Sequence, residues 1–449
     1  GVWGMDYRGD ASTSTQVYFN SNTISNVEFG FVHSALADIV VTGNNISASN
    51  KAISIQHQYT SGGTLQPTIG GFNNIDATGG NTINGVATNS ATIAQLYTIE
   101  DAINHEIDDA ILGFVNVKPN RTYVTPNSFA NPPNTAPSIQ RAIDAVANNG
   151  TVHIQSGMTY VGGIDASAKT VTLAPGASPS CVTVSGNMVL NGGDVLDIEA
   201  NGTTACTDYD QFIVNGTVSL GGATLMLTLG YTPANGDQLK IIDNDLADAI
   251  SGQFAQGTII TVSGHTFDIN YAGGDGNDVV LTKCAGVTNT NTLENFCTIQ
   301  AAIDDPQTLN GHTLTVSPGL FNENVIVNKE LTITGSGKGS NPATNTVVKP
   351  SSACTGVGFT ISAANVTIQN MYVTSFQDAV LLNGVSNPTL NNLALIDYCR
   401  YGITFGGNNS DIDITNTDIQ RTSLLAGTIG MRIGTANSVN GMLIDNCTI

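Results

Sequence analysis

Positive charge is scarce in this chain. Its 449 residues include 14 Lys and Arg against 35 Asp and Glu, so the formal net charge is −21. Such a field repels phosphate backbones, and no local basic patch offsets it, so we expect no nucleic-acid partner. No stretch approaches the roughly twenty apolar residues that cross a bilayer, so we expect no membrane span in this segment.

Common catalytic and metal-binding motifs are missing as well. The six histidines never occur at metal-ligand spacing, and no cysteine lies in a Cys-x-x-Cys pair. The sequence has no Gly-x-Ser-x-Gly motif, no Ser-His-Asp arrangement and no glycine loop of the phosphate-binding kind. These absences argue against zinc, redox, nucleotide and serine-hydrolase chemistry.

Glycine and short β-forming runs are abundant instead. The chain contains 49 Gly, only 11% of its residues are charged, and aliphatic runs such as 182–184 and 225–229 recur. Short apolar runs separated by Asn and Gly turns are typical of many short strands. The composition therefore predicts an all-β protein.

The end of the chain repeats its beginning. Gly427-Thr-Ile-Gly-Met431 through Asn446-Cys-Thr-Ile449 matches Gly1-Val-Trp-Gly-Met5 through Asn22-Thr-Ile24. Repetition of this kind indicates a segment of a longer tandem array. We therefore expect ends that lack a lid and units that join head to tail or in tandem.

A second repeat combines a short helix with a strand. Ser138-Ile-Gln-Arg-Ala-Ile-Asp144 reappears as Thr298-Ile-Gln-Ala-Ala-Ile-Asp304, and each is followed by a strand that ends at glycine. The spacing of apolar residues predicts helices over 138–147 and 298–304, and a third over 98–107 that begins at Thr98. Such helices would cover the first coil of a solenoid.

Asn-containing turns return roughly once per coil in the first 97 residues. They are Asn22-Thr-Ile24, Asn45-Ile46 and Asn81-Thr-Ile83. This pattern resembles the β-helix repeat of pectin-lyase-like proteins, as does 298–449 more loosely. An Asn at the same corner of successive coils can bond to the Asn of the next coil, which predicts an Asn ladder.

The middle of the chain carries a more specific resemblance. Tyr209-Asp-Gln-Phe-Ile-Val-Asn-Gly-Thr-Val-Ser-Leu-Gly-Gly-Ala-Thr-Leu225, Gly236-Asp, Ile241-Ile-Asp-Asn-Asp245 and Tyr271-Ala-Gly-Gly-Asp-Gly-Asn-Asp-Val-Val-Leu-Thr282 look like the autotransporter-associated β-strand module. The resemblance covers 98–283 and implies the adhesin-like or passenger architecture of very large secreted bacterial proteins. It brings no catalytic residues, and for 177–283 solenoid and sandwich both remain open.

These observations divide the chain into four parts. We expect β-helix coils over 1–97, a short helix with a Pro-containing linker over 98–137, a helix-capped β-module over 138–283, and a helix-capped β-helix start over 284–449.

Two segments resemble fragments of pectin-active enzymes. Residues 298–335 with Phe376-Gln-Asp378 are similar to pectin methylesterases, and Asn416-Thr-Asp418 with Arg432-Ile433 is similar to polygalacturonases. The second catalytic Asp and the substrate-binding Arg and Trp of the first family are missing, as are the Asp-Asp and Gly-His-Gly of the second. Acid–base catalysis needs paired groups, so we expect no enzyme.

One turn resembles a calcium-binding repeat. Gly273-Gly-Asp-Gly-Asn-Asp278 is similar to the nonapeptide of RTX toxins, which makes Asp275, Asn277 and Asp278 calcium candidates. Calcium in such repeats takes ligands from consecutive stacked turns, and only one copy is present. A glycine turn before a strand is the simpler interpretation, and calcium is the one cofactor that the sequence suggests.

The seven cysteines can form three disulfide bonds, with one free thiol remaining. Proximity in the sequence pairs Cys181 with Cys206, Cys284 with Cys297 and Cys354 with Cys399, which leaves Cys447. If these pairs are oxidised, they close loops in a secreted protein. Buried free thiols in a β-core are the alternative.

The sequence thus predicts an all-β, right-handed parallel β-helix with short capping helices and an intervening β-rich module. We expect a non-catalytic, structural or adhesive segment of a giant fibre at the bacterial cell surface, with further copies and surface polysaccharide as partners. The alternatives are a polysaccharide-active β-helix enzyme and a calcium-dependent carbohydrate-binding module.

Overall fold

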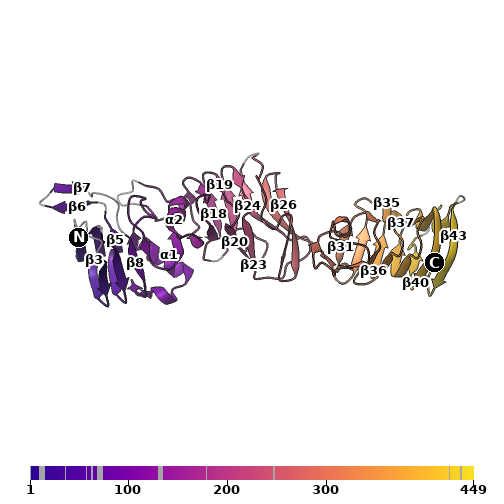
Figure 1. Ribbon diagram of the computed structural model, residues 1–449, viewed down its shortest axis with the longest axis horizontal. Helices are drawn as coiled ribbons and strands as arrows, with labels where there is room; N and C mark the ends of the chain where they lie inside the picture. The colour runs from indigo at the N-terminus through magenta and orange to yellow at the C-terminus, as the bar shows by residue number, and fades with distance from the viewer. Residues whose placement is uncertain are drawn as a thin grey trace. The chain divides into compact units, whose positions relative to one another are not determined.

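The computed structural model is a β-solenoid of about 16 turns with mostly parallel sheets, as the sequence predicted (Figure 1). It describes all residues except 1, 10–15, 36, 57, 62–63, 68–73, 130–134, 178, 246–247, 424 and 435–436. Successive strands of one sheet come from successive coils, so each coil pairs its backbone with the next one.

The chain forms two compact units. The first comprises 1–232, 238–258 and 269–281, and the second comprises 233–237, 259–268 and 282–449.

Two sheets and a hairpin make up the early coils of the first unit. One sheet contains β1 (Trp3–Gly9), β3 (Thr23–Ala35), β5 (Asn45–Ile55), β9 (Thr82–Ile83), β10 (Val86–Ala87) and β11 (Ile103–Asn104). The other contains β2 (Val17–Asn20), β4 (Ile39–Thr42), β8 (Ile75–Gly79) and β12 (Val115–Asn116). The hairpin is β6 (Gln58–Ser61) with β7 (Thr64–Pro67), and a 3₁₀ turn spans Thr88–Ser90.

The later coils of the first unit form three parallel stacks. The first stack is β13 (Arg121–Val124), β14 (Gly150–Ile154), β17 (Val171–Pro175), β20 (Val195–Ala200) and β23 (Thr224–Leu229). The second is β15 (Thr159–Tyr160), β18 (Cys181–Val184), β21 (Gln211–Val214) and β24 (Gln238–Asn244), with β27 (Asp278–Lys283) next in order. The third is β16 (Ile164–Asp165), β19 (Met188–Val189) and β22 (Val218–Ser219). The parallel stacking favours the solenoid over the sandwich here.

Two stacks build most of the second unit, and their strands are parallel except at the start of the larger one, where Val287–Asn289 pairs antiparallel with both of its neighbours. The larger one contains β28 (Val287–Asn289), β29 (Asn295–Phe296), β30 (His312–Val316), β31 (Gly319–Asn322), β33 (Leu331–Thr334), β34 (Thr346–Lys349), β36 (Thr367–Thr374), β38 (Thr389–Ile396), β40 (Asn408–Thr415), β41 (Asp418–Gln420) and β43 (Ser438–Asp445). The smaller one contains β32 (Val325–Val327), β35 (Thr355–Ile361), β37 (Phe376–Asn383), β39 (Tyr401–Gly406) and β42 (Ile429–Ile433). An antiparallel hairpin joins β25 (Ile259–Val262) and β26 (His265–Gly273).

Three α-helices occur among the described residues, and two match the predictions. They are α1 (Ile93–Asp101), α2 (Ile139–Ala145) and α3 (Ile299–Asp304). The expected helix over 98–107 was wrong in position. A capping box between Thr92 and Gln95 starts α1 earlier than Thr98. Ile103 leaves the helix because it pairs with Ile53 of β5.

The segment after α1 is part of the coil stack. β12 pairs with β8, and β13 pairs with β14. Pro126 therefore follows a strand that is already built into the solenoid of the first unit, and Pro132 and Pro133 of the expected linker lie outside the described residues.

The predicted Asn ladder is present, with one change of residue. The Asn22 side-chain amide donates to Asn44 Oδ1 at 3.0 Å, and the Asn44 amide donates to Asn81 Oδ1 at 3.1 Å. Asn44 takes the place expected for Asn45, because Asn45 lies in the strand and pairs with Thr82. The second unit has the same contact between Asn387 and Asn365.

The repeat between the two ends of the sequence corresponds to one packing feature. A Cβ added at Gly4 would lie 2.3 Å from Ile24 Cγ2, and one added at Gly430 would lie 2.9 Å from Ile449 Cγ2. In both places a corner isoleucine fills the space that a larger residue at the glycine would need. The matched sequence motifs therefore encode the same glycine–isoleucine contact in each unit.

Helices α2 and α3 cover edge strands by the same contacts. The Gln140 side chain accepts from the Asp165 N–H at 2.8 Å and donates to the Asp165 carbonyl at 3.1 Å. Gln300 does the same with Ile326, at 2.7 and 3.4 Å. Asp165 and Ile326 lie in β16 and β32, the edge strands of their stacks. Each glutamine amide thus pairs with backbone groups that another strand would otherwise meet.

A lysine closes the carboxyl end of each helix. Lys51 donates to the Asp101 and Ile103 carbonyls next to α1. Lys169 makes the equivalent pair of bonds after α2 with Asp144 and Val146, and Lys329 does so after α3 with Asp305 and Thr308. A cation suits this position because the unpaired carbonyls carry partial negative charge.

Candidate functional site

The two enzyme-like aspartates belong to different stacks. Asp378 lies in β37 and Asp418 in β41. Asp378 accepts two hydrogen bonds from Arg400, at 2.8 and 2.6 Å, and Asp418 forms an ion pair with Lys338 at 2.9 Å. Each carboxylate therefore has a basic partner of its own, and the two do not form one site.

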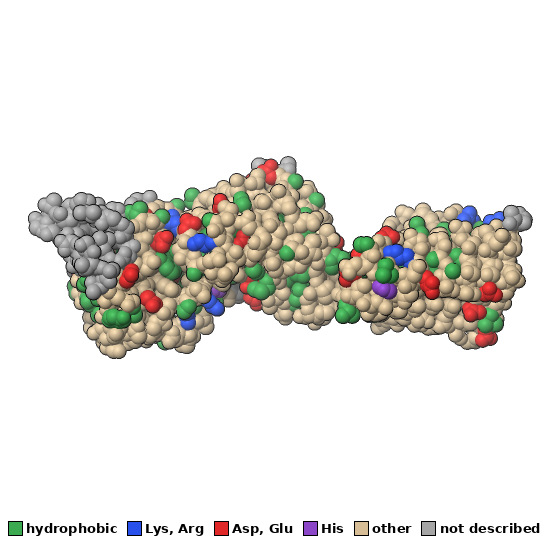
Figure 2. Space-filling model, viewed as in Figure 1, with side chains coloured by type: hydrophobic (Ala, Val, Ile, Leu, Met, Phe, Trp, Pro, Cys, Tyr) green, Lys and Arg blue, Asp and Glu red, His purple; other side chains and the backbone are tan. Residues whose placement is uncertain are grey.

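Arg400 also belongs to an exposed cluster around Tyr401. The guanidinium carbons of Arg400 and Arg432 lie 4.9 and 4.7 Å from the centre of the Tyr401 ring. Arg432 donates to the Tyr401 hydroxyl at 2.6 Å. Cation–π contacts of this kind stiffen a surface. On the face of the molecule shown in Figure 2, charged side chains are scattered between wide uncharged areas.

The three calcium candidates differ in their exposure and in their hydrogen-bond partners. Asp275 is exposed, whereas Asn277 and Asp278 are buried. Asp278 accepts from the Asn244 N–H at 2.9 Å and lies 3.3 Å from Lys240 Nζ, and the Asn277 amide donates to the Asp245 carbonyl. Within the described ranges, no three His, Cys, Asp or Glu residues form a metal-binding group. Calcium binding here stays a prediction.

Sequence reasoning missed a buried polar network beside α1. His105 Nδ1 accepts from the Val115 N–H at 3.0 Å, so the ring proton is on Nε2, which donates to Glu100 at 2.7 Å. Asp108 accepts from the His105 N–H, and burial raises the pKa of Asp108 to about 7. His105 is 1% exposed, so this network joins α1 to the coils and is closed to a substrate.

Disulfides join the predicted cysteine pairs. Cys181–Cys206, Cys284–Cys297 and Cys354–Cys399 have Cα–Cα distances of 4.7, 5.4 and 5.3 Å. The remaining cysteine, Cys447, is a free thiol. Each bridge lies within one unit, and the three bridges span 25, 13 and 45 residues of sequence.

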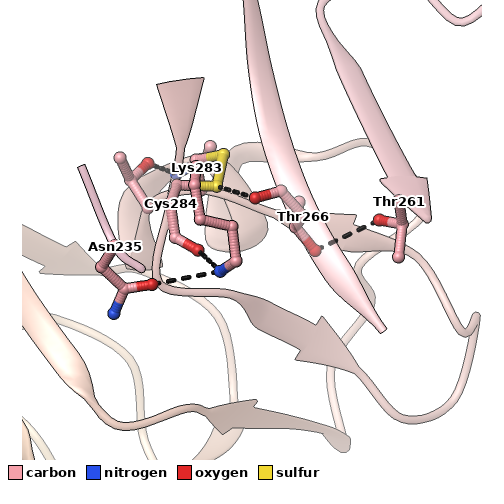
Figure 3. The surroundings of a disulfide bond; sticks show 8 residues. Asn235, Thr261, Thr266, Lys283 and Cys284 are labelled. Atoms are coloured by element: carbon pink, nitrogen blue, oxygen red, sulfur yellow. Dashed lines mark hydrogen bonds between the residues drawn. A yellow bond between two sulfur atoms is a disulfide. The ribbon is translucent and has the colours of Figure 1, made fainter. Parts of the chain in front are cut away.

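A polar pocket of about 200 Å³ lies next to the Cys284–Cys297 bridge in the second unit. Figure 3 shows the Lys283 side chain turned back over Cys284 toward Asn235. The Lys283 ammonium donates to Asn235 Oδ1 at 3.1 Å and to the Cys284 carbonyl. Lys283 is only 8% exposed, and burial lowers the pKa of its amine. The other lining residues are Gly264, Thr266, Ala285, Gly286, Thr288, Asn295, Ser317 and Pro318.

No local sequence pattern predicted this pocket. Lys283 ends a strand, Asn235 lies in a turn, and the remaining lining residues come from four further segments. The pairing of β25 with β26 and of β28 with β29 and β30 brings them together, and the Gly236 N–H bonds to the Lys283 carbonyl, which places the Asn235 turn beside them.

Comparison with known proteins gives one informative similarity. The chain is 34% identical over 112 residues to a cell surface glycoprotein of Methanothermus fervidus, a match that covers 25% of this chain and 18% of that protein. No family model and no solved structure matches the chain. The match thus spans less than a fifth of the relative's length.

The relative and the three disulfides fit an extracellular location. Among the described residues, none of the helices has the length and apolar character of a membrane span. The finer expectations of a bacterial autotransporter or pectin-lyase-like protein stay predictions.

Proposed function

We propose that this chain is a non-catalytic structural segment of an extended cell-surface assembly, built from solenoid modules that follow one another in tandem or head to tail. The observation that carries the proposal is the repeated lid. Gln140 and Gln300 make the same two backbone contacts to edge strands, and Lys169 and Lys329 close the same helix ends.

A lid at the start of a module has a clear physical purpose. An open solenoid end presents unpaired N–H and C=O groups, and any other strand can add to it. A lid on one side leaves growth or connection to the other side, so modules keep a fixed order. A long surface protein needs this control because uncontrolled edge pairing leads to aggregation.

Two further observations support a place outside the cell. Disulfides persist in oxidising surroundings, and three are formed here. The similarity to a cell surface glycoprotein points in the same direction. Adhesion to surface polysaccharide is the partner interaction that the sequence suggests.

Localisation tests the proposal directly. Antibodies against this segment should label the outer surface of intact cells that make the protein, and the labelled material should appear extended by electron microscopy. Labelling only after cells are opened would contradict the proposal.

An activity measurement tests the non-catalytic part. Purified protein incubated with pectin, polygalacturonate and other polysaccharides should release no products. Product release that disappears in Asp378→Asn, and persists in a control Asp413→Asn, would establish an enzyme instead.

A further inference from the structure

Lys283 is a buried cation without an anionic partner at contact distance. No carboxylate oxygen of the described residues lies within 4.0 Å of its Nζ, although other lysines, such as Lys240 and Lys338, have such partners. Burying a charge is costly unless it is paired, and Lys283 has only two neutral oxygens as acceptors. An ammonium has three N–H donors, so one donor remains.

Lys329 shows how the charge of another lysine is stabilised in this protein. Lys329 also donates to two backbone carbonyls, at 2.9 and 2.8 Å, but one of them belongs to Asp305, the C-cap of α3, where the carbonyls carry the partial negative charge of a helix end. Lys283 has no helix end beside its bonds. The Asp237 carboxylate favours the charged form of Lys283, but from beyond the 4.0 Å of an ion pair.

The pocket next to Lys283 offers more unused donors. The Asn295 side chain uses its oxygen to accept from Thr288, which leaves its amide hydrogens. The Ser317 hydroxyl makes no side-chain hydrogen bond within the part of the chain that the structure describes. The Lys283 ammonium, the Asn295 amide and the Ser317 hydroxyl thus each have a donor left on the pocket wall, and three such donors are complementary to an anion with several oxygens.

Volume limits the size of the ligand. About 200 Å³ corresponds to roughly seven water molecules at about 30 Å³ each. Pockets for drug-sized molecules are larger, about 300–1,000 Å³. The space therefore suits one small acid, such as acetate or a single sugar acid, and excludes a long chain threaded through it.

We propose that the pocket at Lys283 binds a small carboxylate ligand, with the carboxylate on the Lys283 ammonium and further oxygens on the Asn295 amide and the Ser317 hydroxyl. A free carboxylate and the acid group of a sugar share this chemistry. The site is independent of the assembly proposed above, because it lies within the second unit and needs no neighbouring module.

Titration calorimetry on the full-length chain tests the site. The probes are sodium acetate and sodium glucuronate, with glucose as the neutral control and sodium chloride at matched ionic strength. We expect saturable binding of at least one carboxylate and none of glucose. Tighter binding of glucuronate identifies a sugar acid, and equal binding identifies a free carboxylate, and both results support the proposal. Binding of glucose as tight as that of glucuronate, or no saturable carboxylate binding, overturns it.

Two variants locate the binding. Lys283→Met should weaken carboxylate binding at least tenfold, because a charge-assisted hydrogen bond is lost. The matched control Lys329→Met loses a comparable pair of carbonyl contacts outside the pocket and should bind normally. Equal binding by wild-type protein and Lys283→Met contradicts the assignment.

Ser317→Ala and an NMR measurement keep the test valid if Lys283→Met fails to fold. Ser317→Ala should weaken binding severalfold. In wild-type protein the pKa of the Lys283 amine should rise when the carboxylate is added, because a nearby anion favours the charged form. An unchanged pKa at saturating ligand would mean that the anion binds elsewhere.

Discussion

Replacing Gln300 with alanine tests whether the α3 lid closes a strand edge. Three hydrogen bonds disappear in Gln300→Ala: one from the Ile326 N–H at 2.7 Å, one to the Ile326 carbonyl at 3.4 Å and one to Asp304 at 2.8 Å. The first two are the contacts that imitate a neighbouring strand. The helix itself remains anchored by Glu323, which accepts from the first two helical N–H groups at 2.9 Å each.

The expected loss of stability is modest and local. A neutral hydrogen bond contributes about 1 kcal/mol net, and the 3.4 Å bond contributes less. Water can reach the β32 edge, because the Ile326 side chain is 52% exposed, so it replaces part of what is lost. We therefore expect the free energy of unfolding of the second unit to fall by about 1–2 kcal/mol.

Hydrogen exchange of single amides is the sharpest assay. The Ile326 N–H has its bond only to Gln300 Oε1, so its protection should fall about tenfold for each 1.4 kcal/mol of local stability lost. Gln369→Ala is the control, because the Gln369 side chain donates to the Thr334 hydroxyl, at 3.0 Å, and touches no backbone group of a described edge strand. Unchanged protection at Ile326, or an equal effect of Gln369→Ala, would refute the idea that the glutamine acts as a substitute strand.

Three other predictions follow from single contacts. Gly30→Ala should destabilise the first unit by about 1–3 kcal/mol, because the new Cβ would lie 2.4 Å from a backbone oxygen, whereas Gly192→Ala, with 3.8 Å of space, should be much milder in thermal unfolding. Titration of denatured, unreduced protein should find one free thiol, and removing the Cys354–Cys399 bridge, which spans 45 residues, should cost about 4 kcal/mol in denaturant unfolding. Burial raises the pKa of Asp210 to about 7 from 3.8, so the folded state keeps a proton that the unfolded state releases. Stability should therefore fall as the pH rises from about 4 to about 7, by up to roughly 4 kcal/mol, and denaturation of Asp210→Asn at several pH values should show a flatter profile.

Local sequence signals determined the repeating parts of this protein. The Ser/Thr-Ile-Gln motif predicted α2 and α3 because apolar spacing acts within one helical turn. The expected capping bond forms only in α3, where Thr298 accepts from the Ala301 N–H, and Ser138 makes no such bond at α2. Asn and Gly turns predicted the coil rhythm, since they set backbone geometry within a few residues. The cysteine pairs followed from proximity in the sequence, because each cysteine bonds to the next one along the chain.

Strand register decided the rest, and only the tertiary structure fixes it. The pairing of Ile103 with Ile53 ended α1 early, and the pairing of Asn45 with Thr82 moved the ladder to Asn44. The pocket at Lys283 depends on segments far apart in the sequence. The physical reason is that side chains alternate between the two faces of a strand, so each strand could pair with its neighbours in more than one register. A local sequence pattern therefore shows that a coil exists. Packing and backbone pairing against the next coil determine which residues of the two coils meet.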